Sequence, residues 1–497
     1  MLVMRTRGTG AHPHLSIKTF GELRAAGIRT QSVREELRAN LLGMLQRGEA
    51  LFPGIIGYEK TVVPALVNAV LSRHDILLLG LRGQAKTRLL RQLAQFLDEW
   101  IPAVAGSPLN EDPFAPILPA TRRLLEECGE DTPIAWISRE RRFNEKLATP
   151  DVSMADLIGD IDPIRASREK LDLSDERAIH FGIVPRTNRG LFLVNELPDL
   201  QARIQVGLLN ILEERDLQIR GFPLRLPLDM LMLFTANPED YTNRGRIITP
   251  LKDRIASQIV THYPRSLEVA LAITAQEADA RRSLEVRLPW FLREAIEEIA
   301  VQARASEHVD QTSGVSARLS IAALELVASN VERRVLRTGE RQPVPRLIDL
   351  YAAVPAVSGK IELVYEGEQE GSARVAARLI GKAVKAVFDR HFPPVHENKK
   401  HPRALEPLYS KVQAWFTSGA NLELTDHRTD GEERTALSAV DGLKELARKF
   451  LHPEDEGEEI AAMGLVLEAL HQHSLLSRDG LEGAAVYGDI LRKMLEG

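Results

Sequence analysis

The stretch Ile76-Leu-Leu-Leu-Gly-Leu-Arg-Gly-Gln-Ala-Lys-Thr87 decides the expected fold of this 497-residue chain. Its first four residues form a short, wholly apolar run, which is typical of a strand buried on both faces of a parallel sheet. A helical pattern follows directly, with apolar residues at Leu89, Leu90, Leu93 and Phe96. A glycine-containing loop between such a strand and such a helix is the usual place of a phosphate-binding loop.

The residue types in this loop suit the phosphates of a nucleotide. Backbone N–H groups need unhindered access to the β-phosphate, and a helix N-terminus adds partial positive charge. Lys86 would bridge the β- and γ-phosphates, and the Thr87 hydroxyl would ligate magnesium. We therefore expect ATP and magnesium as cofactors, with the nucleotide held by Gly80, Gly83, Gln84, Ala85, Lys86, Thr87 and Arg88.

One loop position departs from the usual pattern GxxxxGK[ST], because Ala85 stands where the last glycine is usual. A methyl group is the smallest possible intrusion, and it costs little if the backbone there is helical. The alternative interpretation is a chance Lys-Thr pair at an ordinary helix start.

A second motif, Leu191-Phe-Leu-Val-Asn-Glu196, resembles the Walker B pattern of four apolar residues and two acids. The first acid normally holds magnesium through water, and the second polarises the attacking water. Here Asn195 occupies the first place, where it can still accept a hydrogen bond from a metal-bound water but supplies no charge, so we expect weaker magnesium binding. Glu196 remains available as general base, on a strand that we expect beside the phosphate-loop strand. The alternative is a core strand that merely ends in an exposed Glu196.

Asn237, in Phe234-Thr-Ala-Asn-Pro238, follows the next predicted strand. An asparagine at that strand tip can orient the attacking water beside the γ-phosphate. By itself, Asn-Pro is only a turn signal.

Strands alternate with helical segments through the first half of the chain, which predicts a three-layer α/β domain. Short buried strands are predicted at 76–79, 191–194 and 230–234, a further strand at 133–137, and a surface insertion at 101–119. Helical periodicity dominates after residue 264, and we expect no strands there. The expected domains are an N-terminal segment and helix (1–48), an α/β nucleotide-binding core (49–264), an α-helical lid (265–348) and a helical C-terminal domain (349–497).

The composition excludes several classes of protein. The net charge of −6, from 64 basic and 70 acidic residues, is not the footprint of a dedicated nucleic-acid binder. One cysteine cannot form an internal disulfide, and no apolar run of about 18 residues predicts a membrane span. We expect a cytoplasmic protein.

Six motifs, in order along residues 50–345, resemble the AAA+ branch that holds the magnesium chelatase I-type subunits and the MoxR ATPases. Tyr58 replaces the family's usual glutamine in the first of them. The motifs are Phe52-Pro-Gly-Ile-Ile-Gly-Tyr-Glu59, Ala148-Thr-Pro-Asp-Val-Ser-Met-Ala-Asp-Leu-Ile-Gly159, Arg189-Gly-Leu-Phe-Leu-Val-Asn-Glu196, Leu209-Asn-Ile-Leu-Glu-Glu-Arg-Asp-Leu-Gln-Ile219, Thr235-Ala-Asn-Pro-Glu239 and Leu251-Lys-Asp-Arg-Ile255.

The resemblance implies an AAA+ core with a parallel sheet between helices, a hairpin at residues 218–228, an α-helical lid and a helical C-terminal region. It implies magnesium-ATP hydrolysis in a hexameric ring that remodels a separate partner protein with a von Willebrand A domain. Arg254 would reach into a neighbouring subunit's site, and Arg318 would touch the γ-phosphate as the lid's sensor. Lys86, Glu196, Asn237 and Arg254 are then the catalytic set, and Thr87 and Asn195 hold the metal.

Two other functions stay open. Asn195 makes a nucleotide-binding scaffold with weak or no turnover credible. A DNA-associated AAA+ motor would need basic patches, and the stretches 139–142 and 399–403 are short and read as solvated loops, so nucleic acid is not expected as a partner.

Overall fold

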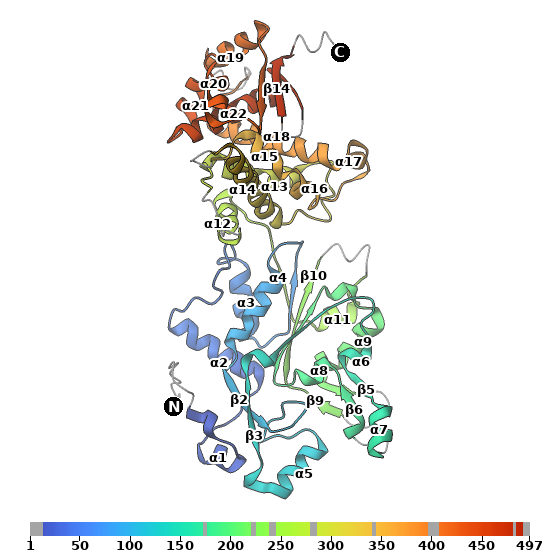
Figure 1. Ribbon diagram of the computed structural model, residues 1–497. Helices are drawn as coiled ribbons and strands as arrows, with labels where there is room; N and C mark the ends of the chain where they lie inside the picture. Colours follow the sequence, from blue (N-terminus) through green and yellow to red (C-terminus); the bar gives the residue numbers. More distant parts are fainter. Residues whose placement is uncertain are drawn as a thin grey trace. The chain divides into compact units, whose positions relative to one another are not determined.

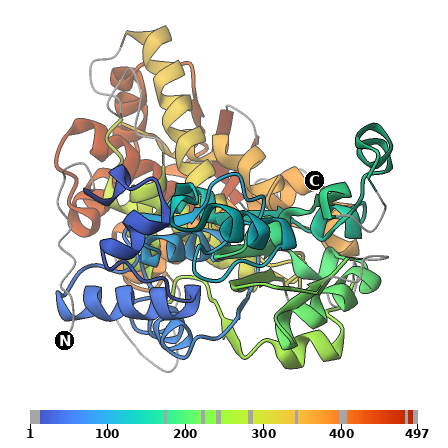
Figure 2. The same cartoon turned by 90° about the horizontal axis from the view of Figure 1, so that it is seen from below.

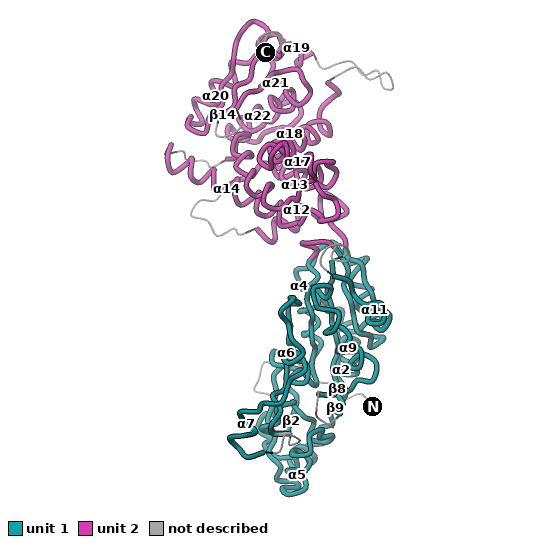
Figure 3. The backbone as a smooth tube through the Cα atoms, turned by 90° about the vertical axis from the view of Figure 1, so that its right-hand side faces the viewer, with its two compact units in different colours: residues 1–80, 85–261 teal, residues 81–84, 262–497 magenta. Residues whose placement is uncertain are grey.

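The computed structural model describes residues 13–171, 176–219, 225–237, 245–278, 286–339, 344–395, 407–480 and 484–490. The chain divides into two compact units (Figure 3). The first comprises Met1–Gly80 and Ala85–Thr261, and the second comprises Leu81–Gln84 and His262–Gly497. The middle of the phosphate loop therefore groups with the second unit. The expected division into four segments remains a prediction.

A five-stranded sheet forms the centre of the first unit (Figure 1). Its order is β11 (Ser257–Val260), β1 (Ile76–Leu79), β10 (Met230–Ala236), β7 (Gly190–Asn195) and β4 (Phe143–Leu147), and every neighbouring pair is parallel. The phosphate-loop strand β1 lies inside the sheet, between β11 and β10. The predicted α/β fold, a parallel sheet between helices followed by a mainly helical region, is confirmed.

Both faces of the sheet are buried, because side chains alternate between them along each strand. One face carries Ile76, Leu78, Leu191 and Leu193, which pack with the apolar sides of α2, α3 and α4. The other face carries residues such as Phe192 and packs with α9 and α11. The helices of this unit are α1 (Phe20–Ala25), α2 (Val33–Gln46), α3 (Val62–Leu71), α4 (Lys86–Gln92), α5 (Pro119–Cys128), α6 (Met154–Leu157), α7 (Pro163–Glu169), α8 (Ile183–Arg186), α9 (Ala202–Glu213) and α11 (Thr249–Arg254).

Helix α2, among the blue helices of Figures 1 and 2, is fixed to the sheet by buried ion pairs. Arg34 donates to Asp75 at 2.6 Å, just before β1 begins. Glu36 accepts two hydrogen bonds from Arg142, at 2.7 and 2.6 Å, and the Arg142 side chain is only 1% exposed. The expectation that residues 139–142 form a solvated basic loop is therefore wrong for Arg142, because the arginine is part of the core.

The described part of the first unit also holds three short antiparallel strand pairs, each of which is a separate two-stranded sheet. The pair β2 (Trp100–Val104) and β3 (Ile134–Ser138) includes the predicted strand at 133–137. It also includes the start of the stretch 101–119, which we expected to be a surface insertion. Strand β5 (Gly159–Ile161) pairs with β6 (Ile179–Phe181). Strand β8 (Asp216–Gln218) pairs with β9 (Arg225–Pro227), at the place of the predicted hairpin, whose turn residues Gly221 and Pro223 lie outside the described residues.

The second unit is mainly helical and has one large apolar core. This unit also contains an antiparallel sheet, in the order β12 (Leu422–Thr425), β14 (Ala484–Asp489) and β13 (Leu476–Asp479). The prediction of no strands after residue 264 is therefore wrong. The helices are α12 (Leu267–Glu277), α13 (Trp290–Ala305), α14 (Arg318–Thr338), α15 (Leu347–Leu350), α16 (Val354–Ser358), α17 (Tyr365–Glu370), α18 (Ser372–His391), α19 (Pro407–Thr417), α20 (Asp430–Ser438), α21 (Leu443–Leu451) and α22 (Glu456–Gln472).

Candidate functional site

Residues 80–87, the predicted phosphate loop, lie between a buried strand and a helix as expected. Strand β1 ends at Leu79, α4 begins at Lys86, and the N–H of Gly80 donates to the carbonyl of Ala236 on β10 at 3.1 Å. The buried Lys86 ammonium donates to the carbonyl of Gly80 in its own loop. To bind a phosphate in the predicted way, this ammonium would exchange the carbonyl for a phosphate oxygen.

Ala85 has a left-handed backbone, with φ 55° and ψ 19°. The condition under which its methyl group would cost little, a helical backbone, is not met. A left-handed conformation costs an L-residue about 1–2 kcal/mol, because Cβ comes close to the following carbonyl oxygen. The usual glycine at this position is thus explained by backbone geometry, and the alanine introduces local strain.

Residues 81–84 contact the segment that precedes helix α14, and all of these residues group in the second unit. Arg82 donates from Nε to the carbonyl of Ser313 at 3.0 Å. Gly83 has φ +74°, and a Cβ at this position would collide with the Ser316 hydroxyl, so both conformation and space require glycine. Arg318 begins α14 two residues later and is exposed. Its sensor role remains a prediction.

Thr87 and Asn195 meet, although they are far apart in the sequence. The Thr87 hydroxyl donates to Oδ1 of Asn195 at 2.9 Å. We expected strand β7 to lie beside β1. Instead, β10 lies between them. The contact forms nevertheless because Asn195 is the last residue of β7 and Thr87 is in the first turn of α4, which covers that face of the sheet.

Glu196 leaves the strand in a left-handed conformation, with φ 56° and ψ 53°. Its backbone N–H donates to the hydroxyl of Thr235 at 3.0 Å. The Thr235 hydroxyl also lies 3.4 Å from Oδ1 of Asn195, to which it donates. In the sequence Thr235 is only part of a motif and has no role of its own. Its signal there is a hydroxyl on β10, two residues before Asn237.

Asn237 directly follows β10 and is 6% exposed. Within the described part of the chain, its Oδ1 has no hydrogen-bond partner. A buried carbonyl oxygen without a partner is uncommon and costs about 1–3 kcal/mol. An atom of this kind at the tip of the strand between the two motifs suits a residue that binds a water or a phosphate group.

Arg254 is engaged within its own chain. It ends α11 and forms an ion pair with Glu213 of α9, from Nη2 to Oε2 at 2.6 Å. The Arg254 side chain is 31% exposed and that of Glu213 is 53% exposed. Exposed ion pairs contribute little, about 0–1 kcal/mol, so this arginine can change partner at low cost.

Nowhere in the described ranges do three or more histidine, cysteine, aspartate or glutamate side chains gather in a way that could hold a metal ion. Among the helices of that same part of the chain, none has the length and apolar character needed to cross a membrane.

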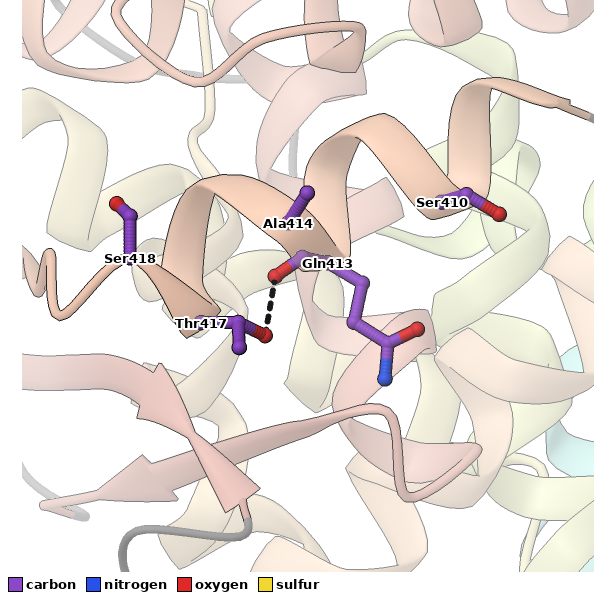
Figure 4. Close-up of a pocket in the computed structure, with 5 residues that line it drawn as sticks. All are labelled: Ser410, Gln413, Ala414, Thr417 and Ser418. Carbon is purple, nitrogen blue, oxygen red and sulfur yellow. Dashed lines mark hydrogen bonds between the residues drawn. The ribbon is translucent and has the colours of Figure 1, made fainter.

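Two cavities lie away from the loop residues 80–87, both in the second unit. One, of about 490 Å³, runs along α19 and is lined by small and polar side chains, with the Thr417 hydroxyl donating to the carbonyl of Gln413 at 3.0 Å (Figure 4). The other, of about 430 Å³, is lined by residues of α12, α13 and α14 and includes Glu297. Burial raises the pKa of the Glu297 carboxyl above its ordinary value.

No protein-family model matches the chain, and no curated protein matches it in sequence. A candidate ATPase from Cytophaga hutchinsonii is 16% identical, with a TM-score of 0.31, over 72% of this chain and 97% of that one. The complex of subunits BchI and BchD of magnesium chelatase gives 20% identity and a TM-score of 0.33, over 64% of this chain and 98% of that one. Hsp104 with ATPγS and casein is 14% identical, with a TM-score of 0.36, over 64% of this chain and 52% of that one. Likenesses at this level carry no argument about function.

Proposed function

We propose that this chain hydrolyses magnesium-ATP and works as an AAA+ remodelling motor of the magnesium chelatase I and MoxR type. The observation that carries the proposal is the 2.9 Å hydrogen bond from Thr87 to Asn195. It joins the residue that follows the phosphate-loop lysine to the residue before the candidate base Glu196. The unpartnered Oδ1 of Asn237 stands at the end of the intervening strand.

The oxygen atoms present fit a hard divalent cation. Magnesium prefers oxygen ligands and keeps several waters, so one protein hydroxyl and the nucleotide phosphates suffice to bind it. The Thr87 hydroxyl uses its proton in the bond to Asn195, which leaves its lone pairs free for the metal. Bound in this place, magnesium would neutralise charge on the β- and γ-phosphates.

The remaining roles follow from the positions of the side chains. Lys86 would bind the phosphates after leaving the Gly80 carbonyl, and Glu196 would accept a proton from the attacking water. Asn237 would orient that water through its unpartnered oxygen. Glu196 is then the only one of these groups that acts as a base.

We further propose that the chain forms a ring, which the family resemblance implies is hexameric. In this ring Arg254 would leave Glu213 and bind the γ-phosphate of the ATP held by a neighbouring subunit. The partner would be a separate protein with a von Willebrand A domain, which rests on the family motifs alone. The expected effect of Arg254→Ala is slower hydrolysis with unchanged ATP affinity, whereas Glu213→Gln, which frees the arginine, should not slow hydrolysis.

Phosphate release by the purified chain and by Glu196→Gln tests the proposal. Removal of a general base costs about 10²–10⁴-fold in rate, so the variant should bind ATP but release phosphate at least about 100-fold more slowly. Glu130→Gln is the matched control, because Glu130 is exposed and pairs only at the surface with Arg24, at 3.0 Å. Equal rates for wild type and Glu196→Gln would exclude Glu196 as the base.

A nucleotide-binding scaffold is the second candidate, and two observations favour it. Asn195 brings no negative charge to the metal site, and Ala85 strains the loop that must enclose the phosphates. A wild-type chain that binds ATP tightly and releases no phosphate would establish this alternative. The burial of Arg142 weakens the case for a DNA-associated motor, because it removes one cation from the basic stretch 139–142.

A further inference from the structure

Thr235 lies level with the end of the second motif. Strands β10 and β7 are parallel and in register, with Phe234 beside Val194, so the next residues along the two strands, Thr235 and Asn195, are neighbours. Alternation along β10 places Thr235 on the face of Leu233, which packs in the same core as α4. The hydroxyl of Thr235 is therefore on the side of the sheet where Thr87 lies.

The Thr235 side chain is fully buried, with 0% exposure. Its hydroxyl accepts the N–H of Glu196 at 3.0 Å and donates to Oδ1 of Asn195 at 3.4 Å. A buried hydroxyl that both donates and accepts has its proton position determined by its partners. Asn195 Oδ1 thus accepts hydrogen bonds from the Thr87 and Thr235 hydroxyls, which also determines the orientation of its amide.

Glu196 depends on this contact for its conformation. Its φ of 56° is unusual for a residue other than glycine, and strain of this kind persists only where surrounding contacts hold it. The turn takes the Glu196 side chain out of the alternation of β7, which would otherwise direct it with Val194 to the face of α9. The hydrogen bond from the Glu196 N–H to Thr235 stabilises that turn.

We propose that Thr235 is a positioning residue, which holds Glu196 in its left-handed turn and Asn195 toward Thr87, so that the base and the metal-binding hydroxyl keep one relative geometry. This inference rests on the proposed ATPase function. In this role Thr235 does not touch the nucleotide. It acts through the Glu196 backbone and the Asn195 amide.

The test compares Thr235→Val with Thr235→Ser. Valine keeps the shape and removes the hydroxyl, and serine keeps the hydroxyl and removes the methyl group. Loss of an outer hydrogen bond that orients a reacting group typically costs about 10–100-fold in activity. We expect kcat of Thr235→Val to fall by about that factor with KM for ATP within about threefold, and kcat of Thr235→Ser to stay within about threefold of wild type.

The control is Thr187→Val, because Thr187 is equally buried and its hydroxyl donates to the carbonyl of Ile183 at 2.7 Å. This variant should leave kcat unchanged. A second measurement, hydrogen exchange of the Glu196 amide, needs no turnover: exchange should be faster in Thr235→Val and unchanged in Thr235→Ser.

Two results would overturn the positioning role: wild-type kcat and amide exchange in Thr235→Val, or equal losses in the valine and serine variants, which would indicate packing alone. Failure of the proposed function looks different, since wild type and Glu196→Gln would then release phosphate at the same rate. In that case the amide exchange still decides whether Thr235 holds the Glu196 turn.

Discussion

Replacing Asn195 by aspartate restores the negative charge that the usual second motif carries. The side chain is 9% exposed, and its Oδ1 is 2.9 Å from the Thr87 hydroxyl. The substitution preserves the shape of the side chain and keeps an oxygen that accepts the hydrogen bonds of Thr87 and Thr235. The variant therefore changes the charge beside the proposed metal position with little other change.

The magnitude follows from distance. Magnesium bound to Thr87 would lie about 2 Å from the hydroxyl oxygen, and so within about 5 Å of the new carboxylate. At an effective dielectric constant of about 20, a divalent charge at that distance gains about 7 kcal/mol. The negative phosphates of the nucleotide beside the metal repel the same carboxylate and offset most of this. We expect a net gain of about 1.4–2.7 kcal/mol, which is about 10–100-fold in magnesium affinity.

The assay is phosphate release at saturating ATP while free magnesium is varied. The half-saturating magnesium concentration of Asn195→Asp should fall about 10–100-fold below that of wild type. Asn68→Asp is the control, because it makes the same charge change at an exposed position of α3. An unchanged or higher half-saturating concentration in Asn195→Asp, or an equal shift in the control, would refute the reasoning.

Three further predictions concern the loop, the core and the second unit. Ala85→Gly relieves the left-handed strain but adds conformational freedom to the unfolded chain, so the free energy of unfolding should stay within about 1 kcal/mol of wild type. ATP should bind more tightly to this variant, and weaker binding in a titration would contradict this. Glu36→Gln leaves Arg142 as a buried cation without its carboxylate and should cost about 3–5 kcal/mol in urea unfolding; a loss below about 1 kcal/mol would show that water reaches the guanidinium. Burial raises the pKa of the Glu433 carboxyl to about 7 from 4.5, so the folded chain binds a proton that the unfolded chain has released, and stability should fall by up to about 3 kcal/mol as pH rises through this window. Urea midpoints at pH 5 and pH 8 should show this fall in wild type and lose it in Glu433→Gln, and an equal fall in both would assign it to another group.

The amino-acid sequence by itself determined the strands of the core and the place of the loop that we predict to bind phosphate. Strands β1, β7 and β10 lie where wholly apolar runs predict them, because burial on both faces requires apolar residues at consecutive positions. The start of α4 at Lys86 also follows from local pattern. Such features depend on residues a few positions apart, and the sequence displays those directly.

Tertiary structure alone decided which residues meet at the site. The order of strands places β10 between β1 and β7, and this puts the Thr235 hydroxyl between Asn195 and the Glu196 backbone. The sequence also did not predict the left-handed turn at Ala85, the burial of Arg142 or the short strands of the second unit. The physical reason is that hydrogen bonds and desolvation depend on neighbours in space, and these come from segments that the periodicity of one stretch cannot identify.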